Sequence, residues 1–175
     1  MDQITVEDFN KAIIELKQSP IYVMSLGSKE LFHSNFWAWI IRQKKYRSFI
    51  LCFFKDFDLD EFKEVIRESK NRDLVIIDKS GNEYVIENKI KSFANIEQLR
   101  KYTKKKGVLT GLEKPSFNSF ENEGWEFISY KKIASELEEI VSLDNSFEGQ
   151  IIKEYCKVLR NIYIVISFAM NQRKK

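Results

Sequence analysis

The stretch YVIENKI, residues 84–90, has an unusual composition for a strand. Tyrosine, valine and isoleucine at its start are typical of a buried β-strand, but Glu87 and Lys89 place charges in the same run. Because successive side chains of a strand alternate faces, these two charges point to one side of the sheet. Burying either charge alone would cost roughly several kcal/mol, so each needs a partner, a metal or a wet cleft. Spacing alone also allows an edge strand with an exposed, salt-bridged face.

The residues before this stretch predict a β-hairpin. DLVIID (73–78) is a second β-rich run, and KSGNE (79–83) between the two runs contains a Gly-Asn turn signal. Antiparallel pairing across this turn brings Asp73 near the Glu87 end of the partner strand. Two converging carboxylates repel each other unless a divalent cation lies between them, and Mg²⁺ is typically held by one or two carboxylates with waters. We therefore expect a Mg²⁺ site there, with Lys89 positioned to orient or deprotonate a water.

The rest of the chain predicts a mixed sheet with helices on both faces. Hydrophobic spacing and capping signals predict helices over 5–17 (starting at Thr5 or Asp8), 29–43 (Ser28 as N-cap), 47–57, 95–107 (Asn95 to Gly107), 131–142 and 149–170. Strands are expected at 108–112 and 125–129. Residues 61–69 fit a helix or a strand equally well. This element order indicates the α/β class.

Length and composition limit the class of protein further. The 175 residues predict one domain, with N-terminal helices over 1–58, an α/β core over 59–130 and C-terminal helices over 131–175. Cys52 and Cys156 lack metal-type spacing and indicate reduced core thiols of a cytosolic protein. The polar N-terminus carries no secretory signal, and the longest apolar run is about half a membrane span, so we expect a cytoplasmic protein without membrane contact.

The motif Asp73…Glu87-Asn88-Lys89 resembles that of the PD-(D/E)xK nuclease superfamily, with Arg72 in place of the usual proline. Three further segments carry the resemblance, which covers residues 28–140. ELFHSNFWAWI (30–40) resembles the helix with an E-L-x-H-S motif that one branch places before the core. QLRKY (98–102) resembles the Q-x-x-x-Y helix that follows the lysine strand, and WEFISYKKIASELE (125–138) resembles the later strand and helix. The resemblance implies a restriction-endonuclease-like fold with a mixed central sheet flanked by helices.

The resemblance also implies roles for individual residues. Asp73 and Glu87 would hold the metal, with the Asn88 carbonyl as a third ligand and Glu30 binding the metal directly or through water. The supporting residues implied by the motifs are Gln98, Tyr102, His33 and Ser34. Each of these has a structural alternative: Glu30 suits a helix N-terminus, His33 a core position, Gln98 a near capping box and Tyr102 simple packing.

We therefore expect a metal-dependent nuclease acting on DNA, using Mg²⁺ with Mn²⁺ as a substitute. The net charge of +3 is too small to establish a polyanion partner, but RKYTKKK (100–106) is a basic cluster in which Lys101, Lys104 and Lys105 are candidate phosphate contacts. Alternatives are an inactive nucleic-acid-binding or protein-interaction module of the same fold, and an assembly domain that uses exposed Phe32, Phe36 and Trp37. The sequence leaves open RNA against DNA, endo- against exonuclease action, and the oligomeric state, a homodimer included.

Overall fold

A computed structural model describes residues 4–25, 30–69, 71–89, 96–102, 104–112, 114–115 and 119–173. The chain folds into two compact units. The sheet unit is Lys29–Ser129, and the helical unit combines Met1–Ser28 with Tyr130–Lys175. The single domain and its internal boundaries, expected from length, stay a prediction.

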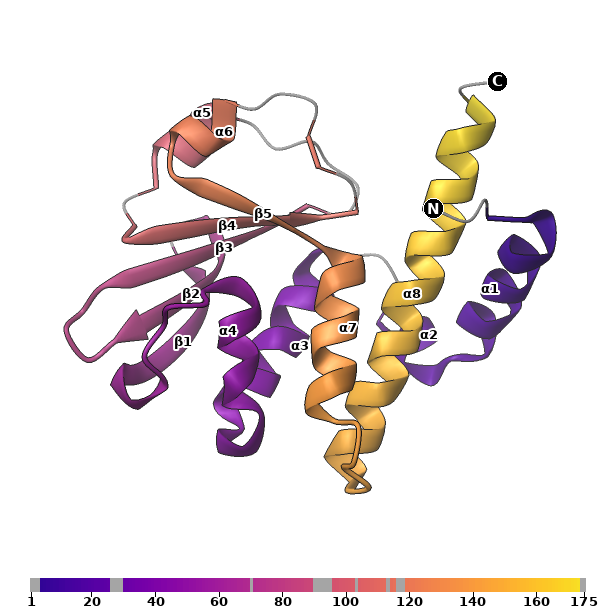
Figure 1. Ribbon diagram of the computed structural model, residues 1–175, viewed down its shortest axis with the longest axis horizontal. Coiled ribbons are helices and arrows are strands. Elements are labelled where there is room, and N and C mark those ends of the chain that lie inside the picture. Colours follow the sequence, from indigo (N-terminus) through magenta and orange to yellow (C-terminus); the bar gives the residue numbers. More distant parts are fainter. Residues whose placement is uncertain are drawn as a thin grey trace. The chain divides into compact units, whose positions relative to one another are not determined.

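The sheet unit is built on five strands in the order β1-β2-β3-β4-β5 (Figure 1). The strands are β1 (Phe62–Ser69), β2 (Arg72–Asp78), β3 (Glu83–Lys89), β4 (Lys106–Gly111) and β5 (Trp125–Ser129). β2 runs antiparallel to both β1 and β3, whereas β4 runs parallel to both β3 and β5. The predicted mixed α/β sheet is therefore confirmed.

The predicted hairpin is formed by β2 and β3. Gly81 has a φ of 83°, which glycine adopts at no steric cost, and the Asp78 carboxylate accepts hydrogen bonds from the backbone and side chain of Asn82. The ambiguous segment 61–69 is a strand, because β1 pairs along the free edge of β2 and buries Val65 there. Tertiary pairing thus decided an element that local pattern left open.

Helices cover both faces of this sheet, as predicted (Figure 1). On one face Leu99 of α5 (Ile96–Arg100) packs in a buried cluster with Val75, Val85, Leu109 and Trp125. The other face contacts α3 (Glu30–Arg42). The rings of Phe54 and Phe57 pack edge-on against the ring of Tyr84 in β3. The remaining short helices of the unit are η1 (Lys44–Phe49), α4 (Ile50–Phe53), η2 (Leu59–Glu61) and α6 (Ser119–Asn122).

Two predicted helices are wrong in extent. The helix expected over 95–107 ends at Arg100, because Lys106–Gly111 pairs with β3 and β5 instead. Gly107 does not stop a helix; it lies under the Trp125 ring, where a Cβ would come within 2.7 Å of that ring. The helix expected over 47–57 is a 3₁₀ segment followed by one turn of α-helix. The expected caps Ser28 and Asn95 lie outside the described residues.

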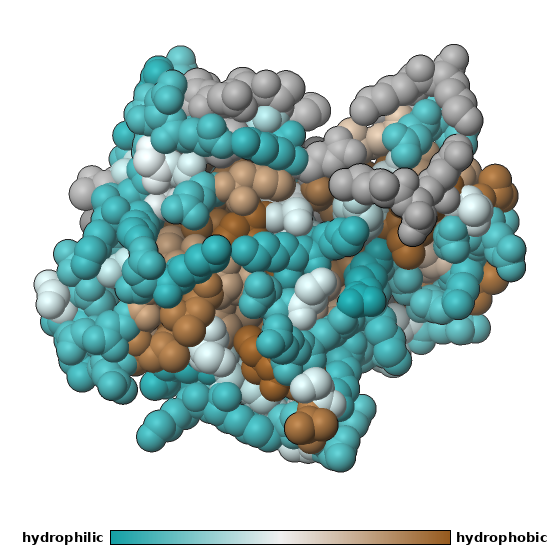
Figure 2. Space-filling view, in the orientation of Figure 1, coloured by the Kyte–Doolittle hydropathy of each residue, from teal (hydrophilic) through white to brown (hydrophobic). Residues whose placement is uncertain are grey.

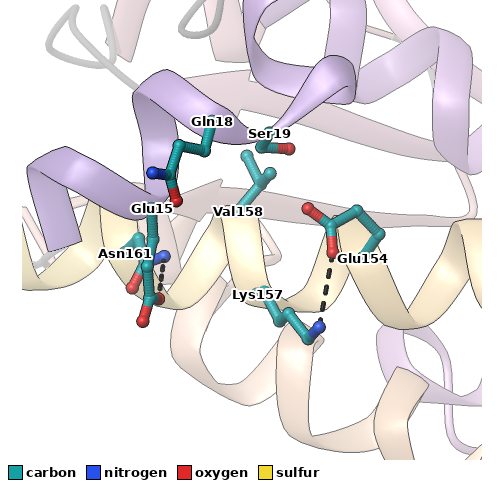
Figure 3. A pocket seen from close by; sticks show the side chains of 7 residues that line it. All are labelled: Glu15, Gln18, Ser19, Glu154, Lys157, Val158 and Asn161. Atoms are coloured by element: carbon teal, nitrogen blue, oxygen red, sulfur yellow. Dashed lines mark hydrogen bonds and ion pairs between the residues drawn. The ribbon is translucent and has the colours of Figure 1, made fainter. Parts of the chain in front are cut away.

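The helical unit contains α1 (Val6–Gln18), α2 (Pro20–Met24), α7 (Tyr130–Ile140) and α8 (Phe147–Arg173). α1 begins at Thr5 with a capping box to Asp8, as the sequence indicated, and α2 was not predicted. Phe9 stacks on Phe168 at 4.6 Å, which joins α1 to α8. A cleft of about 470 Å³ lies between α1 and α8, and four of its polar side chains form two pairs: Asn161 with Glu15, and Lys157 with Glu154 (Figure 3).

Both cysteines are buried in their units, as expected. Within the described part of the chain, no helix combines the length and the apolar character needed to cross a membrane. The face drawn in Figure 2 is mostly hydrophilic, with apolar residues in small groups.

Candidate active site

Asp73 and the Glu87–Asn88 peptide meet at one end of the β2–β3 hairpin. The register pairs Leu74 with Ile86, which places Asp73 one step further along, beside the end of β3. The Asp73 carboxylate accepts a 2.7 Å hydrogen bond from the backbone N–H of Asn88. The structure therefore brings the two predicted acidic positions together through local strand pairing.

Glu87 is a buried carboxylate in which one oxygen has hydrogen-bond partners and the other has none among the described residues. Its side chain is 1% exposed, and Oε1 accepts from Lys89 Nζ at 2.8 Å and from Gln98 Nε2 at 3.1 Å. Oε2 is buried and has no hydrogen-bond partner among the described residues. A buried carboxylate oxygen without a donor is costly, so Oε2 is the atom at which a bound cation would have most effect.

Burial and mutual repulsion shift the ionisation of the acidic pair. Burial, together with the charge of Asp73, raises the pKa of Glu87 to about 7, although Lys89 opposes this shift. Burial also raises the pKa of Asp73, against the Asn88 hydrogen bond and the Lys89 charge. Burial lowers the pKa of Lys89, but its hydrogen bond to Glu87 and the nearby carboxylates outweigh burial and raise it overall. Lys89 is therefore an ammonium at neutral pH.

The first turn of α3 lies against this hairpin. Glu30 is the first residue of α3, and its carbonyl accepts from Asn88 Nδ2 at 2.8 Å and from the Ser34 hydroxyl at 3.1 Å. The Glu30 carboxylate is close enough to Asp73 and Lys89 to raise the pKa of both. The Glu30 carbonyl and the Ser34 hydroxyl thus lie beside the Asn88 side chain, and their roles at the site stay a prediction.

Gln98 and Tyr102 support Glu87 from α5 and the residues after it. Gln98 Nε2 donates to both Glu87 and the Tyr102 hydroxyl, and that hydroxyl donates to the carbonyl of Asn71 in the β1–β2 turn. Burial and the charge of Glu87 raise the pKa of Tyr102, so its phenol stays protonated and able to donate. This chain of hydrogen bonds fixes Oε1 of Glu87 and does not involve Oε2.

The residues present fit a hard divalent cation. Among the described residues no group of three histidine, cysteine or acidic side chains is arranged to hold a metal by itself. Mg²⁺ does not need such a group, because it keeps several waters and is bound by one or two carboxylates. Such a cation would give Glu87 Oε2 a partner and would lower the raised pKa values of the two carboxyls.

Comparison with known families agrees with this geometry. A family model described as the PD-(D/E)XK nuclease superfamily matches residues 21–157. The chain belongs to the PD-(D/E)XK nuclease superfamily. No curated protein and no solved structure matched the chain. The resemblance drawn from the motifs is thus confirmed, and with it the restriction-endonuclease-like α/β fold.

This superfamily member departs from the motif at Arg72. The Arg72 side chain is 4% exposed, and its Nε donates to the Ser69 carbonyl at 3.0 Å in the β1–β2 turn. Arg72 thus occupies the motif position before Asp73, and its side chain closes the β1–β2 turn. Asp73 keeps its place at the start of β2.

His33 and Trp37 of α3 belong to the core, whereas Phe32 and Phe36 are partly exposed. His33 is 0% exposed, its ring contacts those of Phe32 and Trp37, and burial lowers its pKa to about 3. A neutral imidazole follows, which suits packing and leaves a role at the site a prediction. Trp37 is fully buried too, so the assembly hypothesis loses one of its three exposed aromatics.

The three candidate lysines do not share one helix face, because α5 ends before them. Lys101 is exposed. Lys104 lies over the Trp125 ring at 4.6 Å and donates to the Glu123 carbonyl. Lys105 lies over Tyr84 and 4.0 Å from Asp78, at the end of the hairpin opposite Lys89. Their contact with phosphates stays a prediction.

Sequence reasoning missed Thr110 of β4. It is 0% exposed, and its hydroxyl donates to Asn88 Oδ1 at 3.1 Å. Asn71, whose carbonyl receives the Tyr102 hydroxyl, was missed as well. The available signal for Thr110 was a hydroxyl inside the apolar run VLTGL, since a polar residue in a buried strand requires a partner.

The raised pKa of Glu87 predicts a pH-dependent stability for the metal-free protein. A carboxyl with a higher pKa when folded binds protons more tightly in the folded state, so the free energy of unfolding falls as pH rises from about 4.5 to about 7. The loss from Glu87 should be about 3 kcal/mol. Chemical denaturation with a chelator, from about pH 5 to about pH 8, should show this slope in the wild type and a flatter slope in Glu87→Gln.

The matched control is Glu126→Gln, an exposed position on β5 that should keep the wild-type slope. An unchanged slope in Glu87→Gln would mean that Glu87 is not the group that titrates.

Proposed function

We propose that this protein is a metal-dependent nuclease that hydrolyses phosphodiester bonds in DNA, with Mg²⁺ as the cofactor and Mn²⁺ as a substitute. The proposal is supported by membership of a nuclease superfamily over residues 21–157. The observation that carries it is the buried Glu87 carboxylate: Lys89 and Gln98 hold its Oε1, Oε2 has no hydrogen-bond partner among the described residues, and the charge of Asp73 raises its pKa. Two repelling carboxylates, one of them buried, are expected where a cation binds.

In this proposal Asp73, Glu87 and the Asn88 carbonyl hold the cation, and Glu30 binds it directly or through water. When bound, Mg²⁺ supplies Lewis-acid stabilisation of the phosphoryl oxygens and lowers the pKa of a water. Every other task falls to side chains of the chain itself. Gln98, oriented by Tyr102, keeps the Glu87 carboxylate from rotating.

Lys89 acts as a hydrogen-bond donor and a fixed positive charge. Its ammonium lies 2.8 Å from Glu87 Oε1, and its raised pKa keeps it protonated at neutral pH. A protonated amine orients the attacking water and stabilises negative charge that develops on the phosphate, but it does not remove a proton. Of the two roles open from sequence, orientation is the one we propose.

One assay separates this proposal from an inactive binding module of the same fold. Plasmid, linear duplex, single-stranded DNA and RNA are incubated with Mg²⁺ or Mn²⁺, with a chelator as control. We expect metal-dependent cleavage of DNA. Binding without cleavage under all conditions would favour the inactive module, and faster cleavage of RNA would change the proposed substrate.

Glu87→Gln and Lys89→Ala should each lower the cleavage rate by about 100-fold or more, because each removes a charge that the proposed metal site requires. Initial rates with purified protein, alongside circular dichroism to confirm folding, provide the measurement. The matched controls Glu126→Gln and Lys63→Ala change exposed strand positions and should cleave as the wild type does. Wild-type cleavage by either site variant would rule out the proposed assignment.

Asp73→Asn should raise the melting temperature in chelator, since it removes one of two repelling charges and keeps an oxygen that accepts from Asn88. Added Mg²⁺ or Mn²⁺ should raise the wild-type melting temperature with concentration, because ligands of the folded state stabilise it. The response of Asp73→Asn should be much smaller. Equal responses of the two proteins would show that Asp73 is no ligand.

Replacing Lys101, Lys104 and Lys105 by glutamine should weaken DNA binding and reduce its salt dependence by about one slope unit per lost phosphate contact. Lys101, which is exposed, should account for more of the change than Lys104, which already lies over Trp125. Fluorescence anisotropy at several salt concentrations measures the slope. A slope equal to that of the wild type would make this run an ordinary solvated surface.

A further inference from the structure

Asn88 separates Glu87 from Lys89 in β3, so its side chain points to the opposite face of the sheet. That side chain is 0% exposed, and a buried amide needs partners for both its nitrogen and its oxygen. Nδ2 donates to the Glu30 carbonyl at 2.8 Å, and Oδ1 accepts from the Thr110 hydroxyl at 3.1 Å. With its backbone N–H on Asp73, this one residue joins β3 to β2, α3 and β4.

The chemistry of the partners orients the amide. The Glu30 carbonyl can only accept, so the amide nitrogen must face α3. Oδ1 then faces β4, where the Thr110 hydroxyl must donate to it. Thr110 is 0% exposed and is paired with Asn88 in the parallel register, so its hydroxyl is held at this position by the sheet. The Glu87 carbonyl, 3.4 Å from the same hydroxyl, is the more distant acceptor.

We propose that Thr110 and the Asn88 side chain are positioning residues that hold the first turn of α3, and so place the Glu30 carboxylate toward Asp73 and Lys89. This inference rests on the proposed function, in which Glu30 serves the metal site. The Ser34 hydroxyl donates to the same Glu30 carbonyl at 3.1 Å, so the carbonyl is held from two sides. Because Glu30 is the first residue of α3, holding its carbonyl fixes the backbone from which its carboxylate extends.

The catalytic face and the positioning face of β3 are thus linked through its alternation. Glu87 and Lys89 act on one side of the strand, while Asn88 fastens the neighbouring helix on the other. Loss of the Thr110 hydroxyl would leave Oδ1 without its donor and free the amide to rotate away from Glu30. Residues that orient groups at a metal site typically change metal affinity or activity by about 10- to 100-fold when replaced.

The experiment compares Thr110→Val, which keeps the shape and removes the hydroxyl, with Thr110→Ser, which keeps the hydroxyl. Both are made in the wild-type chain and in Glu30→Gln. The readouts are Mn²⁺ affinity by calorimetry, kcat and KM for DNA cleavage, and amide hydrogen exchange in the first turns of α3.

We expect Thr110→Val to weaken Mn²⁺ binding and lower kcat by about 10- to 100-fold, with little change in KM. Exchange at the start of α3 should become faster, and Thr110→Ser should restore all three properties. In the Glu30→Gln chain, Thr110→Val should add little to either loss, because the residue it positions is already neutral.

Wild-type Mn²⁺ affinity and α3 exchange in Thr110→Val would overturn the inference. An equal loss in the wild-type and Glu30→Gln chains would overturn it as well, since the hydroxyl would then act independently of Glu30. If Thr110→Val fails to fold, Asn88→Asp replaces it: it still accepts from Thr110 but cannot donate to Glu30, and the same comparison applies. Absence of cleavage by the wild type would reject the proposed function alone, because Mn²⁺ affinity and exchange would still decide the inference.

Discussion

The burial of the Glu87 carboxylate is the constraint on which the sheet unit depends. A charge that is 1% exposed in a sheet must be compensated, and removing one partner of a buried ion pair is strongly destabilising. Lys89 compensates it from the same strand and Gln98 from the segment that follows. Lys89 and Gln98 both bind Oε1, so Oε2 has no compensating donor among the described residues. The incomplete compensation is what makes the position suitable for a cation.

Stability and the proposed activity oppose each other at this point. Burial and the charge of Asp73 raise the pKa of Glu87, and burial raises that of Asp73, so both carboxyls resist ionisation in the metal-free site. A replacement that removes a charge would relieve the fold and remove a ligand at once. Trade-offs of this kind are common at functional sites, where selection maintains groups that a purely structural protein would lose.

Strand alternation explains how three consecutive residues serve two purposes. Glu87 and Lys89 share the face covered by α5, where Gln98 and Tyr102 complete a hydrogen-bonded chain to Asn71. Asn88 faces the opposite side, where Glu30 begins α3. The chemistry therefore lies on one face and its anchoring helix on the other. A shift of the β2–β3 register by one residue would reverse both, which is why the hairpin turn at Gly81 matters for the site.

The sequence by itself determined the hairpin and its charged motif. Asp73, Glu87 and Lys89 lie within 17 residues, and their meeting follows from a short turn, antiparallel pairing and the two-residue period of a strand. The sequence also indicated the family, because the motifs of that family occur in order along the chain.

Only the tertiary structure decided the rest. A helix predicted over 95–107 became a five-residue helix and a strand, since pairing of β4 with β3 and β5 outweighed the helix propensity of a lysine-rich run. Tertiary packing also places Lys104 over the Trp125 ring and pairs the Thr110 hydroxyl with Asn88. Each contact joins segments far apart in sequence, and no local pattern specifies which buried polar group will find which partner.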